Sequence, residues 1–245
     1  MPYIKETCVA GNTVEISKYY TVRFHPKGEK RQARHKKTTE QQQKVNQRKA
    51  QKELRRLMNA NFVDGDLLVR LDFHNRRDIE ADEMQQLISK ATRKMRAELK
   101  KEGIDLKYIY VKEIGPRGGK HIHMMMSYCS SKTIVKCWPY GGVQIQPLFS
   151  EGQYSKVAEY FIKYADKTEK LVKGELVGKR WYASRNLVKP KITKKVISAN
   201  QFRKEAKPKK GYYLDKESIR EGVSQLTGFE YFSYTLVKTD KRGQG

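Results

Sequence analysis

The pattern of hydrophobic and polar positions along the chain predicts alternating strands and helices. In LLVRLDFHN, residues 67–75, apolar side chains occupy every second position from Leu67 to Phe73. This alternation is typical of a strand with one buried face. From about Asp78 to Glu102, apolar residues recur at helical spacing, acids crowd the first turn and Gly103 follows. These features predict a helix after the strand.

A hairpin is the next expected element. The strand-like runs DLKYIYVKEI and KHIHMMMSY are joined by the turn segment GPRGG, which predicts an antiparallel pair. Residues 12–24 and 229–238 read as further strands, and Ser155 to Lys167 as a second helix. Together these elements predict an α+β fold in which helices flank an antiparallel sheet.

The remaining stretches are polar and basic, and they suggest a division into three parts. We expect residues 1–60 to form a basic N-terminal extension with one strand and a surface helix. Residues 61–178 would form the core domain, and residues 179–245 a basic segment with a closing strand. Within the last part, residues 179–210 are predicted to be irregular.

The charge distribution points to a polyanionic partner. The chain has 52 Lys and Arg against 27 Asp and Glu, a net charge of +25, of which residues 1–60 contribute +10 and residues 179–210 contribute +11. Because no long apolar run spans a bilayer and no apolar signal core is expected at the amino terminus, nucleic acid is favoured over a membrane. The alternative, that both runs are only solvated tails, stays open.

The three cysteines have no CxxC spacing, and their odd number argues against a disulfide framework. We therefore expect a reducing cytoplasm.

His121-Ile122-His123 is the first candidate site. Strand alternation places both imidazoles on one face, where they could grip a divalent cation. If Glu113 lies opposite His121 in the hairpin, its carboxylate joins that face, whereas a slip of one residue sends it to the other. Asp72 and His74 on the first strand are reserve ligands or DNA contacts.

Two imidazoles and one carboxylate suit Mn²⁺ or Mg²⁺ acting on a phosphate. A structural zinc is disfavoured, because no cysteine lies close by in the hairpin. The plainer alternative is that both histidines only make ordinary hydrogen bonds.

The second candidate site is a tandem Tyr-x-x-Lys repeat in AEYFIKYADK. On a helix, Tyr160, Lys163, Tyr164 and Lys167 share one stripe about 100° wide, opposite the apolar residues of the same segment. The tyrosines are therefore expected to point outward, each beside an ammonium group that favours the ionised phenol. A lysine could also neutralise charge on a phosphate. The alternative is that the Tyr and Lys side chains form an ordinary solvent-exposed face, which would give the same sequence pattern.

In order and spacing, Glu113, His121-Ile122-His123 and the Tyr160 to Lys167 repeat resemble the His-hydrophobic-His (HUH) endonuclease superfamily. The tandem tyrosines resemble its two-tyrosine branch, and the closer likeness is to rolling-circle replication initiators (Rep proteins) of plasmids and phages in bacteria. The segments GNTVEISKYYTVRF, KVNQRKAQKELRRLMNANF and SRNLVKP add to the likeness, which covers roughly residues 10–190. LDFHN departs from the family's Thr-rich first motif, so the roles of Asp72 and His74 stay open.

The resemblance implies an antiparallel sheet related to RNA-recognition folds, and it also implies the chemistry. A tyrosine attacks a DNA phosphodiester, leaving a free 3′-hydroxyl and a 5′-phosphotyrosine link, while the metal polarises the phosphate. Tyr160 and Tyr164 would be nucleophiles aided by Lys163 and Lys167, and the second tyrosine allows a second cut. Candidate DNA contacts are Arg70, Asp72, His74, Arg180, Arg185 and Lys189.

GPRGGKH is the nearest match to a phosphate-binding loop, and it fails at Ile114 and His121. We therefore expect no ATP site and dependence on a host helicase.

Three other functions remain open. A transposase or relaxase would use the same chemistry on different DNA. A non-catalytic single-stranded nucleic-acid-binding protein would present aromatic side chains on the sheet face, where this chain has histidines and a glutamate. A structural metal protein is disfavoured by the basic segments.

Overall fold

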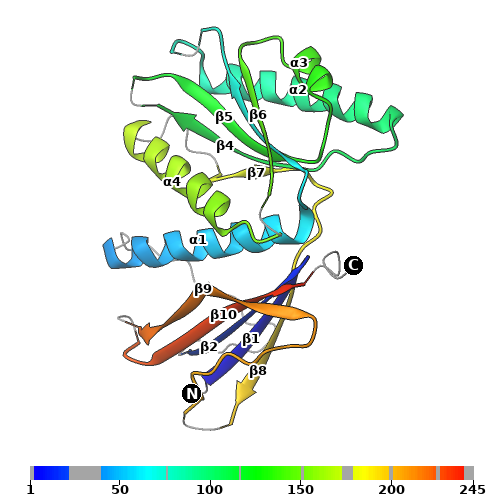
Figure 1. Ribbon diagram of the computed structural model, residues 1–245. Helices are drawn as coiled ribbons and strands as arrows, with labels where there is room; N and C mark the ends of the chain where they lie inside the picture. The colour runs from blue at the N-terminus through cyan, green and yellow to red at the C-terminus, as the bar shows by residue number, and fades with distance from the viewer. Residues whose placement is uncertain are drawn as a thin grey trace, which may run out of the picture. The chain divides into compact units, whose positions relative to one another are not determined.

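The computed structural model describes residues 3–21, 40–75, 77–115, 117–149, 152–172, 179–198, 201–224 and 227–239. The fold is α+β, as predicted, and the described ranges contain two antiparallel five-stranded sheets and four helices (Figure 1). The chain divides into two compact units. One unit comprises residues 47–188, and the other combines residues 1–46 with residues 189–245.

The unit of residues 47–188, the central unit, contains a sheet in the strand order β6-β3-β5-β4-β7. Its strands are β3 (Leu67–Asp72), β4 (Tyr108–Ile114), β5 (Lys120–Met126), β6 (Val143–Pro147) and β7 (Tyr182–Ala183). The helices are α1 (Glu40–Asn61), whose first residues belong to the other unit, α2 (Ala81–Lys101), α3 (Ser131–Cys137) and α4 (Ser155–Val172).

Helices cover both faces of this sheet. On one face, alternate residues of β3 such as Val69 and Leu71 pack with the buried stripe of α2 and with α3. On the other face, Val111 and Met125 pack against α1 and α4. Only one end of this second face is apolar, because its other end carries arginine, aspartate, glutamate and histidine side chains.

The second unit, residues 1–46 with 189–245, is a sheet in the order β8-β1-β2-β10-β9. Its strands are β1 (Tyr3–Ala10), β2 (Thr13–Tyr20), β8 (Lys191–Ile197), β9 (Tyr212–Val223) and β10 (Glu230–Lys238). One face holds a small core of residues from β2 and β10, against which Phe202 and Ala206 pack. The segments at the two ends of the chain thus form one sheet.

The strands and helices with a clear periodicity of hydrophobic residues were predicted correctly, and several other elements were not. The hairpin, β3, α2, α4 and β10 are confirmed, although α4 continues to Val172. The prediction of an irregular segment at residues 179–210 was wrong, because it contains β7 and β8. β8 is an edge strand whose side chains are mostly exposed on both faces, so it lacks the apolar alternation that marks a strand.

β1, β9, β6 and α3 were not predicted either. β2 occupies most of the strand expected at residues 12–24, and residues 22–24 lie outside the described ranges. Gly11, with φ of 53°, connects β1 to β2 through a tight turn that glycine adopts readily.

Candidate functional site

A pocket of about 370 Å³ lies at the polar end of the central unit's sheet, beside α4. Four strands and this helix supply most of its lining. The lining residues are Leu68, Arg70, Glu113, Gly115, His121, His123, Gln144, Gln146, Tyr160 and Tyr164. Both histidines, the glutamate and both tyrosines of the two sequence motifs therefore meet in one cavity.

The strand register explains this convergence. Glu113 lies directly opposite His121 in the pairing of β4 with β5, which is the register that places the carboxylate on the imidazole face. On the other side of β5, Asp72 lies opposite His121 and Arg70 opposite His123. His121 thus has a charged register partner on both sides, whereas His123 lies between Arg70 and Val111.

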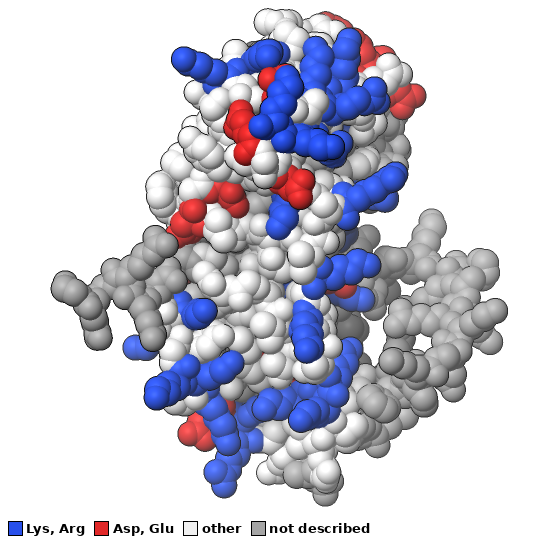
Figure 2. Space-filling model, turned by 90° about the vertical axis from the view of Figure 1, so that its right-hand side faces the viewer, with Lys and Arg blue, Asp and Glu red and all other residues white. Residues whose placement is uncertain are grey.

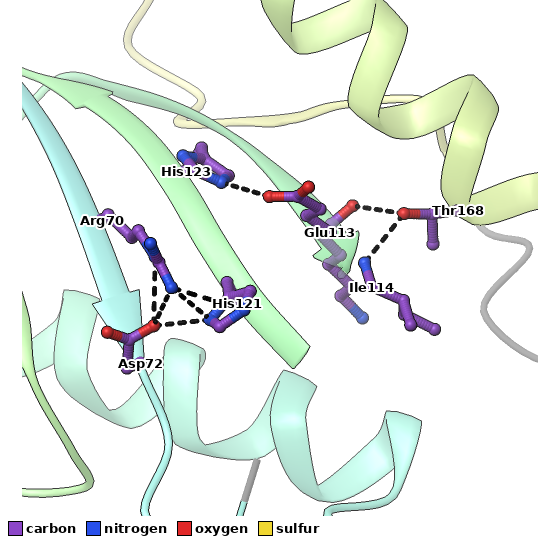
Figure 3. Close-up of polar contacts among 8 residues, drawn as sticks. Arg70, Asp72, Glu113, Ile114, His121, His123 and Thr168 are labelled. Carbon is purple, nitrogen blue, oxygen red and sulfur yellow. Dashed lines mark hydrogen bonds and ion pairs between the residues drawn. The ribbon is translucent and has the colours of Figure 1, made fainter. Parts of the chain in front are cut away.

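His121 is held by Asp72 and Arg70 (Figure 3). Its Nδ1 lies 2.5 Å from Oδ1 of Asp72, and Nε of Arg70 donates to the same oxygen at 3.1 Å. Burial lowers the pKa of His121, and the hydrogen bond to Asp72 opposes this only in part. In a neutral ring that donates its Nδ1–H to Asp72, Nε2 accepts from Nη2 of Arg70 at 3.4 Å, so Arg70 would have to move for Nε2 to bind a ligand.

His123 and Glu113 contact each other directly, with 2.6 Å between Nε2 and Oε2, and both side chains are buried (Figure 3). In the part of the chain that the structure describes, no three His, Cys, Asp or Glu side chains are arranged as a metal site. The donor types in the pocket nevertheless fit a divalent cation. To bind one together, Glu113 and His123 would turn from each other toward the ion.

The tyrosines lie against His123. The ring of Tyr164 stacks on the imidazole, with centroids 4.8 Å apart and planes 7° apart, and Tyr160 meets it edge-on at 5.4 Å. The tyrosine rings are 4.2 Å apart and nearly perpendicular. The expectation that they point outward holds for Tyr160, which is 37% exposed, but Tyr164 is partly buried. Both tyrosines line the pocket, which was not predicted.

The charge near the tyrosines also differs from the expectation. Burial, followed by the hydrogen bond with Tyr164, raises the pKa of Tyr160, whereas Arg70 lowers it. Lys163 and Lys167 do not line the pocket, and Lys163 is exposed. Arg70 on the sheet, rather than a helical lysine, is thus the cation that favours the phenolate of Tyr160.

Thr168 connects α4 to the strand that carries Glu113, and the sequence analysis did not identify it. The backbone N–H of Ile114 donates to Oγ1 of Thr168 at 3.0 Å, and this hydroxyl donates to the carbonyl of Lys112 (Figure 3). Thr168 lies one helical turn after Tyr164. These bonds therefore hold the tyrosine helix in place beside the carboxylate.

Gln144 and Gln146 are further pocket residues that the sequence analysis missed. They alternate with the half-buried Val143 and Ile145 on β6. This short polar–apolar alternation, VQIQ, was the available signal. Their amide groups can donate and accept hydrogen bonds along the wall of the pocket.

The remaining candidate contacts are dispersed. His74 lies in an exposed turn after β3 and does not line the pocket. Arg180 pairs with Asp166, with 3.4 Å between Nε and Oδ1. Arg185 and Lys189 are exposed.

Lys and Arg side chains are spread widely over the face drawn in Figure 2, and Asp and Glu side chains are fewer. Among the described residues, no helix is both long and apolar enough to cross a membrane.

Gly141 allows the close approach that positions Asp72. A Cβ atom at residue 141 would lie 2.2 Å from the carbonyl oxygen of Asp72 and 2.8 Å from Cα of Phe73. Gly141→Ala is therefore expected to destabilise the protein by about 2 kcal/mol, which lowers the melting temperature by roughly 5 °C. Gly142→Ala, whose Cβ would lie 3.4 Å from Asp72, is the control with a smaller effect. Equal melting temperatures for parent and Gly141→Ala would contradict this packing.

Residues 66–169 match the family model described as "Replication-associated protein ORF2/G2P". The match covers less than half of the chain, but it includes every lining residue of the pocket. It is consistent with a rolling-circle replication protein and with DNA as the partner. Searches of curated proteins and of solved structures gave no significant match.

Proposed function

We propose that this chain is a sequence-specific endonuclease and ligase for single-stranded DNA that initiates rolling-circle replication through a 5′-phosphotyrosine intermediate. One observation carries the proposal: His121, His123, Glu113, Tyr160 and Tyr164 line a single pocket. The family match supports a role in replication. The proposal assigns the chain to the two-tyrosine type of HUH nuclease.

His121, His123 and Glu113 would hold a divalent metal, Mg²⁺ or Mn²⁺. When bound, the metal would polarise a non-bridging oxygen of the scissile phosphate. Asp72 keeps His121 oriented through its 2.5 Å contact with Nδ1. Arg70, which lines the same pocket, would neutralise part of the phosphate charge.

In the chemical step, a tyrosine hydroxyl oxygen attacks the phosphorus atom. The bond between Oη and phosphorus forms as the bond between phosphorus and the 3′-oxygen breaks, and the phenolic proton is transferred to the departing 3′-oxygen. The products are a 5′-phosphotyrosine link and a free 3′-hydroxyl. Attack by a 3′-hydroxyl on that link reverses the step and joins two strands.

Because the two tyrosines lie next to each other, one could make the first cut and the other the second. The ring centroids of Tyr160 and Tyr164 lie 4.2 Å apart, so while one tyrosine is linked to DNA the other would remain beside it. It can attack a second phosphate without a new site being built. The enzyme could therefore cut a regenerated origin while it remains attached to the first strand.

The same proposal defines the partners. The chain would act in the cytoplasm of a bacterium on a plasmid or phage origin. Strand separation would need a host helicase, because the chain's nearest match to a phosphate-binding loop fails at two positions.

The test is covalent capture of DNA by the full chain. Single-stranded oligonucleotides that tile the DNA on both sides of the gene are incubated with the protein and Mn²⁺, then separated on a denaturing gel. We expect an adduct with oligonucleotides from one region, and none with EDTA. No adduct across the whole set would overturn the proposal, and adducts only at transposon ends or a transfer origin would assign the same chemistry to a transposase or relaxase.

DNA affinity is expected to fall steeply with salt, because basic residues 1–60 and 179–210 together carry 21 of the 25 net positive charges. Each phosphate that the protein neutralises adds roughly 0.7 to 0.9 to the slope of log affinity against log salt concentration. Fluorescence anisotropy across a salt series measures this slope. If affinity does not change with salt, these segments do not bind the DNA backbone.

A further inference from the structure

Three lysines lie side by side across the sheet of the second unit. Lys5 on β1 is the register partner of Lys195 on β8 and of Lys18 on β2, so all three share one face. Adjacent strands are about 4.8 Å apart. Like charges placed directly opposite one another destabilise a sheet, so this lysine row is unfavourable unless an anion binds to it.

The row lacks acidic partners that would offset this repulsion. Among the residues that the structure describes, none of the three lysines forms an ion pair, although the ammonium of Lys18 donates to the backbone carbonyl of Arg203. Burial lowers the pKa of Lys18, as do Lys5 and Lys207, and only Glu205 opposes them. By contrast, Lys194 points to the opposite face of β8 and pairs with Glu6 at 3.4 Å.

An aromatic cluster adjoins the lysine row. Tyr3 and Tyr20 are register partners two residues along from Lys5 and Lys18, on the same face. Phe229 stacks on Tyr20, with centroids 3.6 Å apart, and is 40% exposed.

Phe202 completes the cluster and connects it to the lysine row. Its ring meets Tyr3 edge-on at 5.0 Å, and the ammonium of Lys18 lies 5.9 Å from its centroid. The lysine row and the aromatic cluster therefore form one continuous surface.

We propose that this surface binds single-stranded DNA, with phosphates along Lys5, Lys18 and Lys195 and a base stacked at Phe229. Cationic side chains that follow the backbone, beside aromatic rings that stack with bases, are the two components of sequence-tolerant single-strand binding. A duplex is disfavoured because its bases are already stacked on one another. The proposal goes beyond nicking, since this binding requires neither the metal nor a tyrosine nucleophile.

The charge component is tested with the full chain in EDTA, where no cleavage chemistry takes place. Anisotropy of a labelled 20-nucleotide oligo-dT reports the affinity, and melting curves check that each variant is folded. The double variant Lys5→Gln/Lys195→Gln is expected to bind about tenfold more weakly and to lower the salt slope by about 1.4, or 0.7 for each lost phosphate contact. As the control, Lys216→Gln and Lys238→Gln are combined, which also removes two charges from the second unit but outside the row and outside residues 1–60 and 179–210. This control should bind within about twofold of the parent.

Equal losses in Lys5→Gln/Lys195→Gln and in the control would overturn the proposal, since affinity would then follow total charge. An unchanged affinity in the double variant would also overturn it. Because the assay measures binding without a covalent adduct, this proposal can be confirmed even if the nicking proposal fails, and it can fail even if nicking is confirmed.

The stacking component has a separate optical test. The two tryptophans, Trp138 and Trp181, both belong to the central unit, so Phe229→Trp introduces a reporter into the second unit. We expect oligo-dT to quench this added emission, and a duplex of the same length to quench it much less. Phe229→Ala should weaken oligo-dT binding about fivefold or more. If oligo-dT leaves the added emission unchanged, no base stacks at Phe229 and the proposed site is wrong.

Discussion

A variant with Phe in place of both Tyr160 and Tyr164 is expected to form no covalent link to DNA, a fall of at least about 10³-fold. Phe keeps the aromatic ring, and with it the packing on His123, but it lacks the oxygen that attacks phosphorus. The measurement is the amount of radiolabelled DNA that stays with the protein on a denaturing gel. Tyr128→Phe, at an exposed tyrosine outside the pocket, is the matched control and should react like the parent.

The two single variants test whether both tyrosines attack DNA or only one of them does. Because both rings line the pocket, Tyr160→Phe and Tyr164→Phe should each retain some covalent linkage to an oligonucleotide with one site. Strand transfer needs a second attack while the first link persists, so it should fail in both. If either single variant performs complete strand transfer at the parent rate, the two-nucleophile scheme is wrong and the spare tyrosine only packs or stacks.

His121→Ala and His123→Ala are each expected to abolish cleavage while DNA binding is largely retained. Each change removes a proposed metal ligand from the pocket without altering the basic segments that are proposed to bind the DNA backbone. Cleavage is measured with Mn²⁺, and binding is measured separately in EDTA. His74→Ala is the control, because the structure places this histidine outside the pocket.

A parallel loss of binding and cleavage would give the two histidines a structural role. In that case the contacts of His121 with Asp72 and of His123 with Glu113 would support the sheet, with no metal involved.

Much of the central unit could be predicted because its strands and helices have strong periods. The alternation in LLVRLD and the helical spacing through α2 each identify an element without knowledge of its neighbours. The hairpin could be predicted in the same way. The face shared by His121 and Glu113 followed from the register that the structure now shows.

The second unit was predicted only in part: strands were expected at β2 and β10, whereas β1, β8 and β9 were missed. β8 has lysines on both faces and is a strand only because β1 pairs with it, from the other end of the chain. The position of the tyrosines in the pocket could not be predicted for a related reason. Helical geometry showed that they lie away from the apolar stripe, but only the packing of α4 beside β4 turns that side toward His123.

The effect of Arg70 on Tyr160 could not be predicted from the sequence either. The tandem lysines suggested the cation that would ionise the tyrosines, since they are three residues away along the helix. In the folded chain burial and Tyr164 raise the pKa of Tyr160, and the cation that opposes this rise is Arg70, 90 residues earlier in the sequence. Such a pair becomes visible only when the sheet register and the position of the helix are both known.

The central claim is that a phenol of α4 becomes bonded to DNA, and peptide mapping of the adduct tests it most directly. Trypsin cleaves after Lys156, Lys163 and Lys167, so Tyr160 and Tyr164 fall on separate peptides, VAEYFIK and YADK. The full chain is reacted with its DNA and Mn²⁺, digested with nuclease and trypsin, and analysed by mass spectrometry. We predict a 5′-linked nucleotide phosphate on VAEYFIK, on YADK or on both. An adduct carried by any other peptide would contradict the account.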